Sequence, residues 1–236
     1  MQTASTPKVL IVGHRGAKGL APENTLESFE IAIKHGVDQI ETDVRLTSDG
    51  QVVIVHDKKF TDAQRKQLRV IDATYPQLRA HNSSLLTLDE AITHVNRRVR
   101  LMIEVKQRVQ TEPVILIVNS FLSEGWRAED FIFASFDYKV LQEVQTALPQ
   151  IELVVLERWS SIRAVSRARR LQTKYISMDQ SFLWSGVVRS LCKRYKLFTY
   201  PSQHIPHRPT DPTRPLKWTK YGIHGIITDY PDRFEH

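Results

Sequence analysis

The chain has 236 residues, of which 41% are hydrophobic and 25% are charged, as in an ordinary globular protein. No apolar run approaches the roughly 20 residues needed to cross a bilayer, and the opening residues MQTASTPK lack the apolar core of a signal peptide. The net charge of +7 could attract nucleic acid, anionic lipid or an anionic substrate, but solvated helix faces are the commoner cause and no nucleic-acid module is recognised, so no nucleic-acid partner is expected.

The first predicted element is a buried strand over Lys8–Val12, because this run is short, apolar and β-branched. His14 and Arg15 come just past the carboxyl end of that strand. Gly16 and Gly19 are then expected to let the chain turn away and approach a ligand closely.

A helix is predicted next, from Asn24 to about Lys34. Asn24 is interpreted as its N-cap rather than as a substrate ligand, because asparagine is a preferred capping residue. Glu27, at the third position, would complete a capping box, and Gly36 would end the helix.

The chain is predicted to return in a second strand over Val37–Val44. Side chains two residues apart on a strand point to the same face, so Glu41 and Asp43 should lie side by side. Two ionised carboxylates repel each other unless a cation lies between them. Oxygen ligands of this kind favour a hard divalent ion, so we expect Mg²⁺ or Ca²⁺ here.

A turn at Asp49 and Gly50 leads into a third extended run, Gln51–Val55, which delivers His56 and Asp57 toward the same end. Four residues that could act in catalysis or metal binding therefore reach the ends of successive strands: His14, Glu41, Asp43 and His56. In a barrel of parallel strands, chemistry takes place at the carboxyl ends of the strands, and the site is expected there.

Beyond Asp57, strands and helices alternate, which favours parallel βα units. Strands are predicted at 100–105, 131–135, 152–156, 175–178, 196–200 and 225–228, and helices at 87–96, 112–123, 138–148, 161–171 and 186–195. Eight core strands result if Gln51–Val55 is an excursion after the second strand, and any eighth helix is absent or vestigial. Pro201–Pro215 is predicted to be a long loop at the rim. No linker or repeat divides the chain, so a single domain is expected over residues 1–236.

The site residues lie within a longer stretch that resembles the glycerophosphodiester phosphodiesterase family. The matching stretch is HRGAKGLAPENTLESFEIAIKHGVDQIETDVRLTSDGQVVIVHD, His14 to Asp57. The resemblance resumes at LMIEVK (Leu101–Lys106), ASFD (Ala134–Asp137) and GIITDYPD (Gly225–Asp232), and it therefore spans nearly the whole chain.

The resemblance implies a (β/α)8 TIM barrel that binds one divalent cation, Mg²⁺ or Ca²⁺. Carried over by position, three carboxylates would be the metal ligands: Glu41, Asp43 and Glu104. Two histidines would be the acid and the base: His14 and His56. Two cations would hold the phosphate oxygens: Arg15 and Lys106.

The resemblance also implies a reaction, the hydrolysis of glycerophosphodiesters such as glycerophosphocholine or glycerophosphoethanolamine to sn-glycerol 3-phosphate and an alcohol. The free glycerol hydroxyl would attack first, giving a cyclic phosphate that water opens, and such intramolecular attack gains from proximity. The sequence leaves the roles of the two histidines open. The working assignment is His14 as base and His56 as acid, because Asp57 would raise the pKa of His56 if it reaches it.

Two stretches depart from the family pattern. After the second histidine the family usually has a segment rich in Arg-Thr-Thr and Gly, where this chain has DKKFTDAQRKQL at 57–68. A late strand of the family often carries Trp-Thr-Val-Asn, where this chain has LFTYPSQH at 197–204. Both stretches would lie near the pocket rim, so they leave the alcohol part of the substrate open.

Two other functions remain as alternatives. A phosphodiesterase like lysophospholipase D or sphingomyelinase D would share the His, Glu-x-Asp, His layout, but the missing signal peptide and the single cysteine, Cys192, argue against it. A non-catalytic barrel could bind nucleic acid or anionic membrane through its basic faces, yet every catalytic position of the motif is filled. One cysteine allows no intrachain disulfide, and a cytoplasmic location is expected. The expected partner is a small-molecule glycerophosphodiester.

Overall fold

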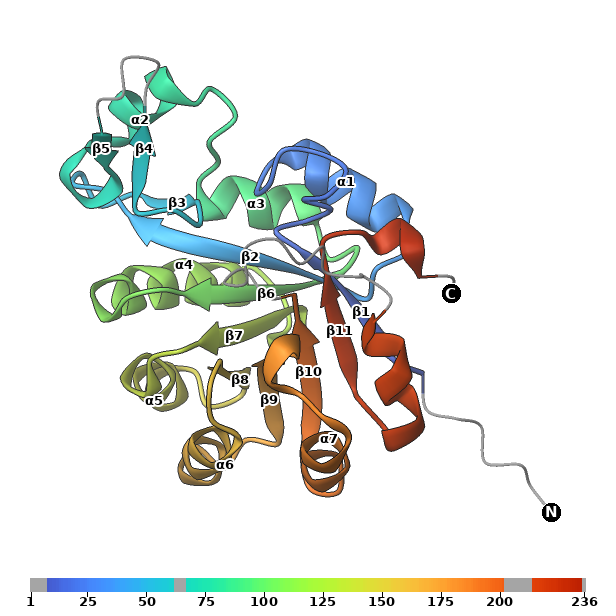
Figure 1. Cartoon of the computed structure of the whole chain (residues 1–236). Coiled ribbons are helices and arrows are strands. Elements are labelled where there is room, and N and C mark those ends of the chain that lie inside the picture. The colour runs from blue at the N-terminus through green and yellow to red at the C-terminus, as the bar shows by residue number, and fades with distance from the viewer. Residues whose placement is uncertain (1–7, 62–66, 202–213, 235–236) are drawn as a thin grey trace.

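Eight parallel strands close into a barrel in the computed structural model of the chain, which describes residues 8–61, 67–201 and 214–234 (Figure 1). The barrel closes because β1 pairs with β2 on one side and with β11 on the other. The fold is therefore the predicted TIM barrel. Its strands are β1 (Leu10–His14), β2 (Gln39–Leu46), β6 (Arg100–Val105), β7 (Phe131–Ser135), β8 (Glu152–Glu157), β9 (Tyr175–Asp179), β10 (Lys196–Tyr200) and β11 (Gly225–Thr228).

Helices follow most of the strands and cover the outside of the barrel (Figure 1). They are α1 (Leu26–Lys34), α3 (Leu88–Val95), α4 (Thr111–Ser123), α5 (Tyr138–Ala147), α6 (Ser161–Arg170) and α7 (Ser185–Cys192). Between β10 and β11 the described residues form a 3-10 helix, η5 (Arg214–Tyr221), which packs on α7. After β11 they form one short 3-10 turn, η6 (Pro231–Arg233), in place of a full eighth helix.

An excursion leaves the barrel after β2, as the sequence predicts. Its first strand, β3 (Val52–Ile54), pairs antiparallel with β2 and is not a barrel strand. The hairpin of β4 (Lys59–Thr61) and β5 (Gln67–Arg69), the turn η1 (Val70–Asp72) and helix α2 (Tyr75–His81) follow, and together they project beyond the end of β2 (Figure 1). A small core of its own holds the excursion together: Val53, Val70, Ala73, Leu78 and Leu85.

The barrel interior is a packed apolar core below the site. Alternate strand residues fill it, because side chains of a strand point in turn to the inside and to the helices. Within the barrel Gly225 is required, since a Cβ atom there would lie 2.3 Å from the ring of Phe198. The interior residues are Val12, Met102, Ile132, Ala134, Val154, Leu156, Phe198 and Ile227. The carboxylate cluster lies above this core, at the carboxyl ends of β2 and β6.

The prediction that Asn24 caps the first helix is wrong. The N-cap of α1 is Thr25, whose hydroxyl accepts a hydrogen bond from the backbone N–H of Ser28, and Ser28 rather than Glu27 completes the capping box. Asn24 has left-handed backbone (φ 58°), and its side chain turns toward β2. There it accepts a hydrogen bond from the Thr42 hydroxyl at 2.8 Å. The polar side chains at the end of β2 therefore outweigh the intrinsic capping preference of asparagine.

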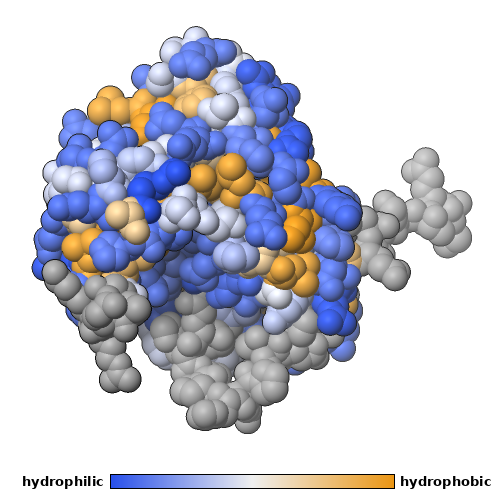
Figure 2. Space-filling view, turned by 90° about the horizontal axis from the view of Figure 1, so that it is seen from above, coloured by the Kyte–Doolittle hydropathy of each residue, from blue (hydrophilic) through white to orange (hydrophobic). Residues whose placement is uncertain are grey.

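Among residues 8–61, 67–201 and 214–234, none of the helices has the length and apolar character needed to cross a membrane. Figure 2 shows apolar residues as separate groups among hydrophilic ones on the viewed face. Three of the sequence predictions concern residues outside the described ranges. They are the loop over most of the proline-rich stretch 201–215, the lack of a signal peptide at the first residues, and residues 62–66 and 202–204 of the two departing stretches.

Candidate active site

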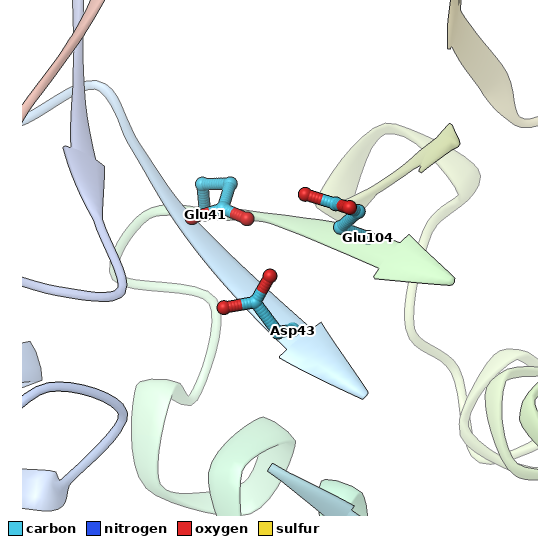
Figure 3. Close-up of side chains that lie close together, drawn as sticks. All are labelled: Glu41, Asp43 and Glu104. Carbon is cyan, nitrogen blue, oxygen red and sulfur yellow. The ribbon is translucent and has the colours of Figure 1, made fainter. Parts of the chain in front are cut away.

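Three buried carboxylates meet at the carboxyl ends of β2 and β6 (Figure 3). Asp43 and Glu104 are paired neighbours in the parallel register of these strands, and Glu41 lies two residues earlier on the same face of β2. Each offers one oxygen within 4.8 Å of the others. Their exposed fractions are 4% for Glu41, 1% for Asp43 and 7% for Glu104, so water screens their charges little.

Two cations approach this cluster from either side. The Nζ atom of Lys106 lies 2.6 Å from a carboxylate oxygen of Asp43 and 2.6 Å from one of Glu104. Arg15 places Nε 3.0 Å from Asp43, while its other end binds Glu23 through two bonds of 2.8 and 2.9 Å. Arg15 and Lys106 are therefore held beside the carboxylates, with their charged groups in fixed positions.

The carboxylates differ in how strongly they hold a proton. Burial raises the pKa of Glu41 well above its usual value, and the charges of Asp43 and Glu104 raise it further. Burial also raises the pKa of Glu104, although Lys106 offsets part of that effect. Burial acts in the same direction on Asp43, but Lys106 and Arg15 outweigh it and lower the pKa of that carboxyl. The protein cations thus keep Asp43 ionised and leave the other two carboxyls short of positive charge.

A divalent cation fits this cluster by the chemistry of its donors. Three converging carboxylates form a set of hard oxygen ligands of the kind that Mg²⁺ and Ca²⁺ prefer. The raised pKa values of Glu41 and Glu104 indicate that Arg15 and Lys106 do not by themselves balance the buried negative charge. A bound cation would supply that balance, and the acidic triad can therefore hold a metal ion.

His14 is the last residue of β1 and lies against a partner from the other end of the chain. Its Nδ1 contacts the carboxylate of Asp229, just after β11, while its Nε2 lies 4.0 Å from Glu41. Burial lowers the pKa of His14, which favours the neutral ring. With Nδ1–H donating to Asp229, the neutral ring carries its unprotonated nitrogen on the side of Glu41.

The turn after β1 has left-handed backbone at two successive residues, Arg15 (φ 52°) and Gly16 (φ 82°). This conformation directs the backbone N–H of Arg15 to a carboxylate oxygen of Glu41 at 3.1 Å. At Gly16 a Cβ atom would lie 2.4 Å from the hydroxyl of Ser28, so glycine is needed for α1 to pack under the turn. Gly16 thus serves close packing within the chain.

His56 reaches the site from the start of the excursion, after β3. Arg45 fixes this position by donating from Nε to the backbone carbonyl of His56 at 2.9 Å. The Nδ1 of His56 lies 2.9 Å from Asp57, as the working assignment requires, and this contact raises the pKa of His56. Burial and the charge of Lys106 lower it more strongly, so the net direction is down.

Six of the seven predicted site residues line one cavity, whose empty volume, including space open to solvent, is about 510 Å³. They are His14, Arg15, Glu41, His56, Glu104 and Lys106. Asp43 is not among the lining residues and lies beneath them, bound by Arg15 and Lys106.

The rest of the cavity wall is aromatic, apolar and, at one point, basic: Met102, Ala134, Phe136, Leu156, Arg158, Tyr200 and Ile227. Tyr200 stands in the late strand where the family often carries tryptophan. Sequence reasoning missed Arg158 in this wall, and it also missed two residues that hold the histidines, Asp229 and Arg45. For Asp229 a signal existed, because it directly follows the last strand, the neighbour of β1 in a closed barrel.

An eight-stranded barrel with a buried acidic cluster at the carboxyl ends of its strands, and with two histidines beside that cluster, is typical of TIM-barrel hydrolases. Comparison with known proteins narrows this class. The sequence profile of the glycerophosphoryl diester phosphodiesterase family matches residues 14–188. A glycerophosphodiester phosphodiesterase of Bacillus altitudinis is 28% identical over 239 residues, covering 94% of this chain and 95% of the relative.

Solved structures share the fold. The glycerophosphodiester phosphodiesterase of Thermotoga maritima superposes with a TM-score of 0.74 at 26% identity, over 96% of this chain and 97% of that chain. A phosphodiesterase of Oleispira antarctica, solved with its product sn-glycerol-3-phosphate, superposes with a TM-score of 0.79 at 24% identity, over 95% and 94% of the two chains. The chain therefore belongs to the glycerophosphodiester phosphodiesterase family of hydrolases.

Proposed function

We propose that the chain hydrolyses glycerophosphodiesters to sn-glycerol 3-phosphate and an alcohol, with Mg²⁺ or Ca²⁺ held by Glu41, Asp43 and Glu104. The observation that carries the proposal is the convergence of these carboxylates, two histidines and two cations on one cavity of a chain of this family. Release of glycerol 3-phosphate from glycerophosphocholine, with and without a chelator, tests it. No release with the metal-loaded protein, or full turnover in saturating chelator, would contradict it.

The phosphate would bind between the cations and the acidic cluster. A bound divalent ion would polarise a phosphoryl oxygen and orient the diester. Arg15 offers a planar fork of donors and Lys106 a compact point charge, both suited to the remaining oxygens. Both cations are already held by carboxylates, so they need little reorganisation when the anion arrives.

Proton transfer would be divided between the two histidines. His14 would take the proton of the glycerol hydroxyl at Nε2 while the hydroxyl oxygen forms a bond to phosphorus. His56 would give a proton to the alcohol oxygen as its bond to phosphorus breaks, leaving a cyclic phosphate that water then opens. The contact of His14 with Asp229 supports its role as base, because it orients the ring and would stabilise its protonated form. The contact of His56 with Asp57 supports its role as acid.

The cyclic route predicts that the substrate needs a hydroxyl next to the phosphorylated carbon. We expect glycerophosphocholine to be hydrolysed and its 2-deoxy analogue to be nearly inert, because the analogue lacks the internal nucleophile. The measurement is kcat/KM for both esters, with competition binding to show that both occupy the cavity. Equal rates on the two esters would favour direct attack by water.

Arg158 predicts a preference among the leaving alcohols. Its side chain lines the cavity, its guanidinium lies 5.4 Å from the centre of the Phe136 ring, and it forms no ion pair within the described residues. This positive charge would repel the cationic choline group of glycerophosphocholine, whereas it would not repel an uncharged glycerol group. We expect Arg158→Gln to raise kcat/KM for glycerophosphocholine relative to glycerophosphoglycerol by about fivefold, for an interaction of ~1 kcal/mol. Arg189→Gln, at an exposed arginine of α7, is the matched control. An unchanged ratio in Arg158→Gln would remove Arg158 from substrate selection.

A further inference from the structure

The segment from Arg158 to Lys196, which contains α6 and α7, is strongly basic. It has ten lysine or arginine residues and one acidic residue, leaving 23 basic and 25 acidic residues in the rest of the chain. The one acidic residue, Asp179, is buried, whereas eight of the cations are exposed. We call these eight the basic flank: Arg163, Arg169, Arg170, Lys174, Arg189, Lys193, Arg194 and Lys196.

Most of the basic flank is not neutralised by neighbours. Within the part of the chain that the structure describes, only Arg163 of the eight forms an ion pair, with the buried carboxylate of Glu157. Four of the eight lie on α6 and α7, which lie next to each other on the outside of the barrel, and the other four follow the carboxyl ends of these helices (Figure 1). The flank therefore presents several positive charges to the solvent.

Three large apolar side chains are exposed where α6 and α7 begin. Trp159 is 58% exposed, Ile162 is 82% exposed and Trp184 is 64% exposed, and we call them the aromatic edge. The loops that carry the two tryptophans are in contact, because the rings of Trp159 and Phe182 lie 4.8 Å apart in an edge-to-face arrangement. Grouped exposure of such side chains on a monomer marks an interaction surface.

The aromatic edge is continuous with the active-site cavity. Both loops follow the carboxyl ends of strands, β8 and β9, and so lie at the same end of the barrel as the carboxylate cluster. Arg158 connects the two, since it lines the cavity and its guanidinium lies 5.6 Å from the centre of the Trp159 ring. Whatever binds the aromatic edge therefore lies beside the mouth of the cavity.

We propose that the aromatic edge and the basic flank form a docking surface for an anionic phospholipid bilayer. Tryptophan prefers the headgroup level of a membrane, and an exposed isoleucine gains by entering its apolar part. Lysine and arginine near an anionic leaflet are attracted by its negative surface potential. The cations at the far ends of α6 and α7 lie roughly 15 Å from the aromatic edge, by the rise of a ten-residue helix. Contact of both with the bilayer would therefore place the side of the barrel that carries α6 and α7 against the membrane surface.

Two other occupants agree less well with these observations. Nucleic acid would bind the cations through its phosphates, but the aliphatic side chain of Ile162, 82% exposed, would gain nothing from a phosphate backbone. A second copy of this chain, docked about a two-fold axis, would bring two basic flanks together, and like charges repel. A bilayer matches both the apolar and the charged part of the surface.

Vesicle binding tests the proposal without any turnover. The metal-loaded protein is mixed with vesicles of equal parts phosphatidylglycerol and phosphatidylcholine, or of phosphatidylcholine alone, and bound protein is measured by flotation at low and high salt. We expect binding to the anionic vesicles, little to the neutral ones, and loss of binding at high salt. Lys193→Gln/Arg194→Gln should weaken binding by about fivefold for each cation removed. Ile162→Ser/Trp184→Ser should weaken it at least as much.

Matched controls lie elsewhere on the barrel. Leu116→Ser removes a side chain of α4 that is 62% exposed, and Lys34→Gln/Lys58→Gln removes two exposed lysines; both should bind like the wild type. Turnover of glycerophosphocholine should be unchanged in all four variants, which shows that they fold. If Ile162→Ser/Trp184→Ser loses turnover, Ile162→Ser alone replaces it. Four results would each overturn the proposal. They are equal binding to both kinds of vesicle, equal losses of binding in the control variants, tighter binding to duplex DNA in competition, and a dimer in sedimentation that the variants dissociate.

Discussion

Replacing Glu41 with glutamine is expected to reduce kcat/KM by roughly 10³-fold or more, because a Lewis-acidic metal supplies several kcal/mol of transition-state stabilisation. Glutamine keeps the size of the side chain but removes the charge that would hold the cation. Calorimetric titration with Mg²⁺ or Ca²⁺ should show one site in the wild type and greatly weakened binding in the variant. Glu112→Gln, at an exposed carboxylate of α4, is the control and should change neither property.

The metal-free variant is expected to be at least as stable as the metal-free wild type at pH 7. The pKa of Glu41 is raised in the folded state, so the native protein binds a proton more tightly than the unfolded chain does. The free energy of unfolding of the wild type therefore increases as the pH falls through the folded-state pKa of Glu41. Above that pKa, the destabilisation by the buried negative charge is fully present. Glutamine removes this destabilisation. A metal-free variant that unfolds far below the wild-type temperature would contradict the destabilising effect of the buried charge. A variant that keeps full activity would contradict the ligand role of Glu41.

Changing either histidine to alanine is expected to lower the rate by about 10²- to 10⁴-fold. The two losses should differ on a substrate with a good leaving group, such as the p-nitrophenyl ester of glycerol phosphate, because that group needs little protonation. The ester should rescue His56→Ala far more than His14→Ala. Rescue of His14→Ala alone would reverse the roles, and rescue of neither, in variants that fold and bind metal, would contradict acid–base catalysis by this pair.

The pH profile of kcat/KM gives a second test of the histidine roles. Burial lowers the pKa of His14, so the acidic limb, where the base becomes protonated, should lie below pH 6.5. Asp57 raises the pKa of His56, so Asp57→Asn should lower that pKa and move the alkaline limb to lower pH. Asp89→Asn, at an exposed carboxylate of α3, should leave the profile unchanged. A shift of the acidic limb in Asp57→Asn would assign His56 as the base.

The alternation of strands and helices and the convergence of two of the three carboxylates were predictable because both depend on local periodicity. Glu41 and Asp43 share a face through the two-residue repeat of a strand, and the structure confirms that they converge. The antiparallel run after β2 was also foreseen as an excursion. The partner carboxylate, Glu104, came from the family resemblance, because the pairing of β2 with β6 is a contact between segments some 60 residues apart in the chain.

The remaining site contacts depend on long-range packing. Asn24 has the local signal of a helix cap, but the hydroxyl of Thr42 and the carboxylate of Asp43 hold its side chain instead. Arg158 lies in a basic segment, and in the fold its side chain packs over Phe136 and Trp159 and lines the cavity. No local pattern in the sequence distinguishes either residue from an ordinary cap or an ordinary surface arginine.

The contact between His14 and Asp229 links the first barrel strand to the residue after the last one. During synthesis on the ribosome, the carboxylate cluster is complete once Glu104 has emerged, whereas His14 waits for more than a hundred further residues before its partner exists. A nascent chain therefore contains all three carboxylates long before it contains the residue that contacts His14. Because Asp229 follows β11, the strand that pairs with β1, turnover that depends on His14 would also depend on closure of the barrel.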